Sequence, residues 1–149
     1  MFPLALSLVL ANSALAETPS TRSVTLPTGK TVEAQVMTPE AGSLEAQTLE
    51  AMKMAKAGKH DAWISQFCGP TLCEGPDAIA SVKRLNLTSA QRTVGQCFEG
   101  DNLVVTKVKG DRESENRVTL YTWCGEGRMP APVTWERTGE SWKIASFSW

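Results

Sequence analysis

The sequence contains little of what enzymes and nucleic-acid-binding proteins usually carry. It has one histidine and one tyrosine, and 15 basic residues face 16 acidic ones, for a net charge of −1. Binding to nucleic acid or to an anionic membrane surface depends on clustered Lys and Arg, so this balance argues against both. There is no nucleophile elbow, no His-x-x-x-His motif and no glycine-rich phosphate loop. The sequence therefore predicts no catalytic machinery, no cofactor and no metal site.

Long apolar runs are also scarce, and the one that is present lies at the N-terminus. Residues 2–11 read FPLALSLVLA, and Ala14-Leu15-Ala16 follows shortly after. The run is too short to span a bilayer, and small residues two apart are what signal peptidase cleaves, although no Lys or Arg precedes the run. We therefore expect residues 1–16 to be a signal peptide, the mature chain to lack a membrane span, and the protein to be periplasmic or secreted.

Four cysteines fit an exported protein: Cys68, Cys73, Cys97 and Cys124. In an oxidising compartment an even number of cysteines predicts disulfides, although four cysteines allow three pairings. We favour Cys68 with Cys73, which closes a short loop, and therefore Cys97 with Cys124. The alternative is a four-thiolate zinc site, which is disfavoured because the spacing lacks the tight pairs of zinc ribbons.

The second pairing sets a condition on the fold. If residues 93–98 and 117–124 flanked a strand at 103–109, Cys97 and Cys124 would lie about two strand spacings apart, roughly 10 Å. That distance is beyond the reach of a disulfide. The pairing therefore requires residues 93–98 to bend away from the sheet or to pair elsewhere.

The mature chain begins with a polar segment. Residues 17–42 contain two short segments with strand character, 24–26 and 32–36, on either side of Pro27-Thr28-Gly29-Lys30. A proline and a glycine at this spacing favour a turn. The segment is therefore either a short hairpin or a flexible leader to the domain.

A helical region follows. Residues 44–57, 60–67 and 77–85 have apolar residues three and four positions apart, which predicts three helices. Ser43 and Asp77 stand where residues that cap helix N-termini are expected.

The pattern becomes alternating after residue 93. This change predicts antiparallel strands, which we place at residues 103–108, 117–124, 133–137 and 142–149. Helices followed by such strands predict an α+β domain with its helices on one face of the sheet. Strict alternation in the last strand puts Phe147 and Trp149 opposite Ile144, where they would form an exposed apolar patch suited to a homodimer through the sheet.

The end of the chain carries a family resemblance. Residues 133–147 read VTWERTGESWKIASF, a strand, a turn at Gly139 and a strand that opens with Trp142-Lys143-Ile144. Together with the predicted helices, this order resembles the nuclear transport factor 2-like (SnoaL-like) superfamily over residues 43–148. The resemblance implies a cone-shaped domain, in which N-terminal helices pack into a curved antiparallel sheet.

The expected organisation is thus a signal peptide at 1–16, a polar segment at 17–42 and a nuclear transport factor 2-like domain at 43–149. Members of this superfamily include isomerases, cyclases, dehydratases, ligand binders and assembly domains. The fold alone therefore selects no function.

An enzyme in such a cone would need an acid–base pair. The chain offers Tyr121 with Asp61 or His60, but His60 and Asp61 stand at a predicted solvated joint between two helices, where a surface role is favoured. A ligand cavity would instead be lined by aromatic side chains, whose default role is to fill the core. The candidates for such a lining are Trp63, Phe67, Tyr121, Trp123 and Trp135.

We therefore expect an exported, disulfide-stabilised domain that binds a small apolar ligand or a protein partner without turnover. Two alternatives stay open. One is an isomerase- or dehydratase-type enzyme that uses the cone cavity. The other is a self-associating accessory or structural module.

Overall fold

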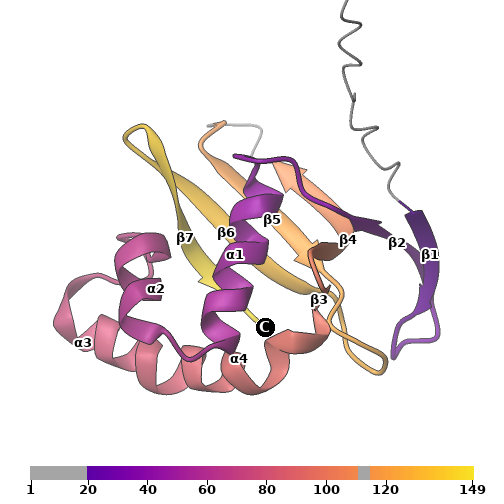
Figure 1. The fold of residues 1–149 in the computed structure, drawn as a ribbon, viewed down its shortest axis with the longest axis horizontal. Helices are drawn as coiled ribbons and strands as arrows, with labels where there is room; N and C mark the ends of the chain where they lie inside the picture. The colour runs from indigo at the N-terminus through magenta and orange to yellow at the C-terminus, as the bar shows by residue number, and fades with distance from the viewer. Residues whose placement is uncertain (1–19, 111–114) are drawn as a thin grey trace, which may run out of the picture.

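The computed structural model describes residues 20–110 and 115–149, so the expected signal peptide lies outside the described residues. The described chain is an α+β domain whose helices precede most of its strands (Figure 1). In chain order, the elements are β1 (Ser20–Thr25), β2 (Thr31–Met37), α1 (Leu44–Lys56), α2 (His60–Phe67), α3 (Gly75–Ser81), the π-helical η1 (Val82–Leu87), α4 (Thr88–Thr93), the 3₁₀ turn η2 (Val94–Gln96), β3 (Phe98–Glu99), β4 (Asn102–Gly110), β5 (Arg117–Thr122), β6 (Ala131–Thr138) and β7 (Ser141–Phe147).

All seven strands form one antiparallel sheet. Its order is β1-β2-β4-β5-β6-β7, and the short β3 also pairs with β4. The helices lie on one face, with α1 crossing in front of the strands (Figure 1). A single core of buried side chains from α1, α2, α4 and strands β4 to β7 fills the layer between helices and sheet.

The polar N-terminal segment forms a hairpin. The amide of Leu26 donates to the carbonyl of Lys30 over 2.8 Å, and the amide of Gly29 donates to the carbonyl of Leu26 over 2.9 Å. Gly29 has a φ of 83°, which a residue without a Cβ adopts at little cost. Because β2 pairs with β4, this hairpin belongs to the same sheet as the C-terminal strands.

The first helix begins at its predicted cap, Ser43, but the third has its N-cap at Glu74 instead of the predicted Asp77 and is longer than expected. The hydroxyl of Ser43 accepts a 3.1 Å hydrogen bond from the amide of Ala46 at the start of α1. The helix predicted at 77–85 begins at Gly75 and continues through η1 and α4 to Thr93. Two further residues with no exposed surface, Leu87 and Ala90, extend its apolar face, and no glycine or proline interrupts it before Thr93.

The predicted apolar patch at the C-terminus was wrong, and a β-bulge explains why. Trp135 on β6 pairs with Ile144, whereas Val133, two residues earlier, pairs with Phe147, so β7 contains one extra residue. The extra residue turns Phe147 to the same face as Ile144. Its ring lies 5.1 Å from that of Trp63, so it packs on the core.

Trp149 also belongs to the core. Its side chain is 5% exposed, and its ring lies 4.8 Å from Phe147 and 6.5 Å from Trp63. The two residues expected to mediate self-association thus pack on the core of the same domain.

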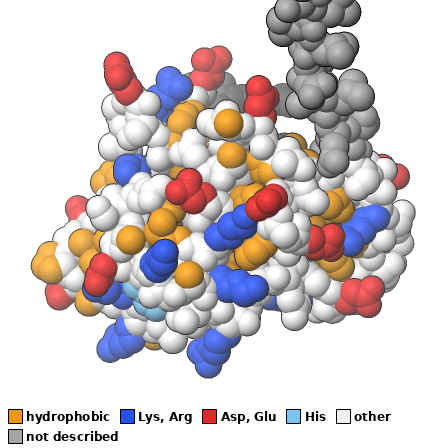
Figure 2. All heavy atoms as spheres, viewed as in Figure 1, with side chains coloured by type: hydrophobic (Ala, Val, Ile, Leu, Met, Phe, Trp, Pro, Cys, Tyr) orange, Lys and Arg blue, Asp and Glu red, His pale blue; other side chains and the backbone are white. Residues whose placement is uncertain are grey.

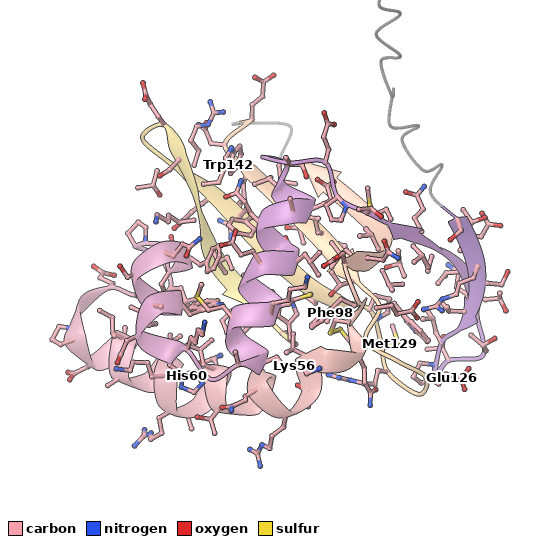
Figure 3. The ribbon with its side chains drawn as sticks, viewed as in Figure 1. Lys56, His60, Phe98, Glu126, Met129 and Trp142 are labelled. Carbon is pink, nitrogen blue, oxygen red and sulfur yellow. A yellow bond between two sulfur atoms is a disulfide. The ribbon has the colours of Figure 1, made fainter. Side chains whose placement is uncertain are left out.

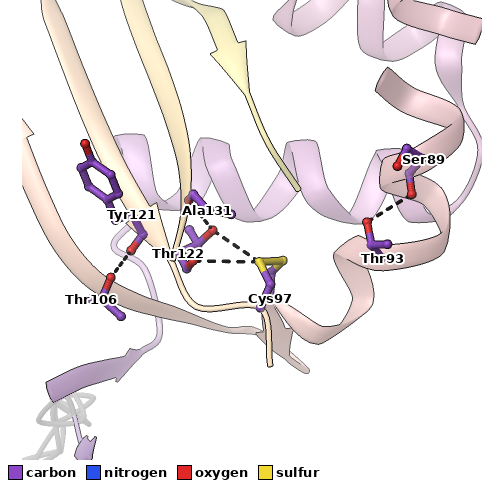
Figure 4. The surroundings of a disulfide bond; sticks show 8 residues. Ser89, Thr93, Cys97, Thr106, Tyr121, Thr122 and Ala131 are labelled. Atoms are coloured by element: carbon purple, nitrogen blue, oxygen red, sulfur yellow. Dashed lines mark hydrogen bonds between the residues drawn. A yellow bond between two sulfur atoms is a disulfide. The ribbon is translucent and has the colours of Figure 1, made fainter. Parts of the chain in front are cut away.

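Both favoured disulfides are present, Cys68–Cys73 and Cys97–Cys124. The condition for the second is met because Cys97 does not lie across β4 from β5. The amide of Val104 donates to the carbonyl of Cys97 over 3.5 Å, and the carbonyl of Val104 accepts from the amide of Trp123 over 3.0 Å, so Cys97 and the end of β5 lie on the same side of β4. Figure 4 shows this disulfide next to Thr122 at the end of β5. Since no cysteine is free, no thiolate is left for the zinc alternative.

Candidate functional site

The five aromatic residues that sequence analysis grouped as a cavity lining divide between the two faces of the sheet. Trp63, Phe67 and Trp135 lie in the core between helices and sheet, and each is at most 2% exposed. Phe67 packs edge-on against Trp135 at 6.2 Å and lies 6.0 Å from Trp63. These side chains therefore fill the space that a cone cavity would need.

The polar atoms of the two buried tryptophans are satisfied within the domain. The indole N–H of Trp63 donates to the carbonyl of Ala51 over 3.2 Å, and that of Trp135 donates to the hydroxyl of Thr48 over 2.9 Å. Neither indole is left to orient a ligand. Both residues act in packing.

Tyr121 and Trp123 lie on the opposite face. Leu120 and Thr122 have no exposed surface, and because side chains alternate along a strand, Tyr121 between them points away from the core. The carbonyl of Tyr121 accepts a 3.0 Å hydrogen bond from the hydroxyl of Thr106 (Figure 4). Both aromatic rings are half-buried.

Trp123 covers a second, smaller apolar cluster on that face. Val24, Ala34 and Val104, from β1, β2 and β4, are at most 5% exposed beneath it. The guanidinium of Arg22 lies 5.1 Å from the centre of the indole, which is within the range of a cation–π interaction.

An ion pair holds Arg22 in this position. Its Nη2 atom lies 2.7 Å from Oε1 of Glu99, which belongs to the short strand β3. The ion pair is partly exposed, so its contribution to stability is small, but it fixes the side chain over the indole.

A surface hollow of about 500 Å³ opens beside Trp123. Nε1 of Trp123 and Nε of Arg22 are buried and have no acceptor among the described residues. Figure 3 places Glu126 at the end of the β1–β2 hairpin, on the rim of this hollow. We call this feature the Trp123 hollow, and its lining residues are Arg22, Ser23, Val24, Thr25, Trp123, Glu126 and Gly127.

The candidate acid–base residues are not brought together. Asp61 and His60 lie in the first turn of α2, whereas Tyr121 points away from the helices because its neighbours Leu120 and Thr122 face the core. Asp61 forms a hydrogen-bonded ion pair with Lys83, which lowers the pKa of its carboxyl, and the nearby His60 lowers that pKa further. His60 is half-buried, and its Nε2 has no partner among the described residues.

On the helical face, basic and acidic side chains are interspersed (Figure 2). Within residues 20–110 and 115–149, no three His, Cys, Asp or Glu side chains gather closely enough to hold a metal ion. No helix in those ranges has the length and apolarity needed to cross a membrane.

Comparison with known proteins gives no relative. No family model, curated protein or solved structure matches this chain. Function is therefore inferred from the site itself.

Arg22, Glu99 and Glu126 were not predicted as site residues from the sequence. Arg22 and Trp123 are about 100 positions apart, and only the pairing of β1, β2 and β4 brings them together. One signal was present in the sequence: Arg22 and Val24 alternate with polar residues, so they share a face if this segment is a strand.

Proposed function

We propose that this protein is an exported, disulfide-stabilised domain of the nuclear transport factor 2-like (SnoaL-like) cone class that binds a protein partner without turnover. The Trp123 hollow is the binding site. Helices packed on one face of an antiparallel sheet support the class, and the two disulfides support the compartment. The observation that carries the binding site is that Arg22 and Trp123 both line this hollow and that each has a buried donor, Nε and Nε1, that no described residue satisfies.

The chemistry of the hollow favours an uncharged polypeptide segment. A buried donor without an acceptor costs about 1–3 kcal/mol, and a bound acceptor recovers part of that cost. Glu99 already neutralises Arg22, and Glu126 on the rim repels carboxylates, so a neutral carbonyl fits better than an anion. Beside these donors, the indole face of Trp123 offers apolar contact area of the kind that anchors protein interfaces.

The filled interior weakens the case for a small apolar ligand in the cone. Trp63, Phe67 and Trp135 occupy the layer where such a ligand would lie. The separation of Tyr121 from Asp61 and His60 by the sheet likewise weakens the case for an isomerase or dehydratase.

The proposal is tested by photocrosslinking in the export compartment of the native host. A photoreactive residue is placed on the rim of the hollow with Glu126→p-benzoylphenylalanine. The matched control is Ser65→p-benzoylphenylalanine, an exposed position on α2 far from the hollow. We expect a covalent adduct with another polypeptide from position 126 only, and its loss when Trp123→Ala is added.

The mass of the adduct identifies what is bound. An adduct that contains a different polypeptide supports the binding site. In the protein that is not crosslinked, a mass that begins at Glu17 and lacks four thiol hydrogens supports export and both disulfides. Equal crosslinking from positions 65 and 126, or an adduct that survives Trp123→Ala, would overturn it.

A further inference from the structure

The two edges of the sheet differ in how they are protected. At the β7 edge, the amide of Gly69 donates to the carbonyl of Ile144 over 2.9 Å, and Nζ of Lys143 donates to the carbonyl of Gln66 over 2.6 Å. Cys68 forms a one-residue bridge with Ile144 there as well. The loop closed by Cys68–Cys73 and the end of α2 thus cover this edge at Lys143 and Ile144. At the other end, none of the described residues pairs with the outer edge of β1.

The hairpin fixes which backbone groups β1 presents at that edge. The bond from the amide of Leu26 to the carbonyl of Lys30 marks a hydrogen-bonded pair. Such pairs alternate along an antiparallel ladder, so Val24 and Arg22 bond to β2, opposite Val32 and Ala34. The amides and carbonyls of the three residues between and beside them point outward: Thr21, Ser23 and Thr25.

β1 carries none of the usual devices that prevent edge pairing. Its register with β2 is continuous over all six residues, and the strand contains no proline, lysine or bulge. Its one charged side chain, Arg22, is held over Trp123 and against Glu99, away from the edge. Among residues 20–110 and 115–149, nothing pairs with these six outward backbone groups, so a strand from another chain can pair with them.

We propose that the strand that pairs with this edge is β1 of a second copy of the same chain, antiparallel, with the two-fold axis at Ser23. In this register Ser23 faces the partner subunit's Ser23, and Thr21 faces the partner subunit's Thr25. The outward amides and carbonyls of Thr21, Ser23 and Thr25 then all face outward amides and carbonyls of the partner strand. Thr–Thr pairs are favourable across strands, and Arg22 faces the partner subunit's Val24.

The two neighbouring symmetric registers are worse. An axis at Arg22 would place two guanidinium-bearing residues directly opposite each other, which is destabilising. An axis at Val24 would leave Thr21 without a partner within β1 and reduce the ladder to Ser23 and Thr25. The sequence of β1 is thus self-complementary in one register, which is why a second copy fits better than an arbitrary strand.

The covered edge at β7 determines the size of the assembly. A sheet with two open edges could add copies without limit, whereas one open edge joined by a two-fold axis closes at a dimer. The dimer also affects the Trp123 hollow, because Arg22 to Thr25 of β1 form one of its walls. The partner subunit's Val24 lies beside that wall, so, if the proposed function holds, the dimer completes the binding site.

Sedimentation velocity on the mature, oxidised chain tests the dimer, from about 1 to about 200 µM because a short edge interface is expected to be weak. We expect the wild type to shift from monomer to dimer over this range. Ser23→Pro removes an outward amide without touching the ladder to β2, so it should stay monomeric. The matched control Ser23→Ala keeps the amide and should dimerise like the wild type.

Cysteine crosslinking tests the register and does not depend on Ser23→Pro folding. Hydrogen-bonded pairs have Cα atoms about 5.5 Å apart, within disulfide range. Ser23→Cys should therefore link two copies under mild oxidation at least about tenfold faster than Thr21→Cys, which faces the partner subunit's Thr25. A monomer at every concentration, a dimer in Ser23→Pro, or equal rates for the two cysteine variants would overturn the proposal.

The same variants separate this inference from the proposed function. Loss of the dimer in Ser23→Pro, with the position-126 adduct retained, would leave the hollow as a binding site of the monomer. A β1 edge that pairs only with a different polypeptide would overturn the second copy as its occupant. A dimer that gives no adduct at position 126 would leave the edge pairing intact and overturn the proposed function.

Discussion

The indole N–H of Trp135 on β6 donates a 2.9 Å hydrogen bond to the hydroxyl of Thr48 on α1, and both side chains have no exposed surface. The same hydroxyl donates to the carbonyl of Leu44 over 2.7 Å. Two elements 87 positions apart in the chain are thus joined by a polar contact inside an apolar layer. The contact fixes which turn of α1 lies over β6.

Removing the hydroxyl of Thr48 should destabilise the protein even when the shape of the side chain is kept. Thr48→Val replaces the hydroxyl by a methyl group and leaves the Trp135 N–H buried without a partner, so we expect a loss of about 1–3 kcal/mol in the free energy of unfolding. Thr48→Ser keeps the acceptor and loses one methyl group, so it should cost less. Urea unfolding followed by tryptophan fluorescence measures both, and equal losses would show that packing alone matters here.

The part of the fold that sequence predicts well is the part set by local pattern. Ser43, the apolar spacing of α2 and the alternation around Leu120 each act over a few residues, and the structure has the expected elements there. The preference for Cys68–Cys73 also followed from a short separation, five positions.

The errors and omissions come from interactions between distant segments. The extra residue in β7 is visible only in its register with β6, yet it turns Phe147 from the outside to the core. The Trp123 hollow likewise depends on the order β1-β2-β4, which no local pattern of residues encodes. Alternation predicts a face correctly only while the ladder stays regular.

The two disulfides should differ in their contributions to stability. In the chain-entropy treatment, stabilisation grows with the closed loop, and separations of 27 and five positions correspond to about 3.5 and about 2 kcal/mol. The paired variant Cys97→Ala/Cys124→Ala should therefore lower the urea midpoint more than Cys68→Ala/Cys73→Ala. The reverse order would indicate that the contacts of the Cys68–Cys73 loop with β7 contribute more to stability than the difference in loop-closure entropy.

Gly69 is needed because no side chain fits where the disulfide loop meets the sheet. A Cβ at this position would lie 2.7 Å from Oε1 of Glu136 and 2.9 Å from the carbonyl oxygen of Ile144, and the latter is backbone that cannot easily move. Glu136 is itself held by the amide and hydroxyl of Thr71, at 3.2 and 2.6 Å. Gly69→Ala should therefore destabilise the protein by about 1–3 kcal/mol.

The matched control is Gly95→Ala. Its Cβ would meet only the end of the flexible Lys56 side chain, at 3.3 Å, which can move aside. Thermal unfolding of the two variants should show a lower midpoint for Gly69→Ala alone. Similar midpoints would mean that the loop shifts to accommodate the methyl group.

The ion pair between Asp61 and Lys83 predicts a pH dependence with a definite sign. The hydrogen bond and charge of Lys83 hold the pKa of Asp61 below its ordinary value of 3.8. A carboxyl whose pKa is lower in the folded state contributes stability above the unfolded pKa and loses it as pH falls through the folded pKa. The stability difference between wild type and Asp61→Asn should therefore be constant from about pH 7 to about pH 5 and shrink below about pH 4.

The control for this measurement is Asp77→Asn, which removes an exposed carboxylate that has no ion-pair partner among the described residues. Because Asp61 is exposed, the effect is small, and urea midpoints collected over the whole pH range are needed to resolve it. Salt provides a second readout, since an exposed pair is screened and its pH-dependent difference should decrease in about 1 M NaCl. If the urea midpoints of Asp61→Asn and Asp77→Asn fell equally at low pH, the ion pair of Asp61 with Lys83 would not contribute to linking α2 and η1 in solution.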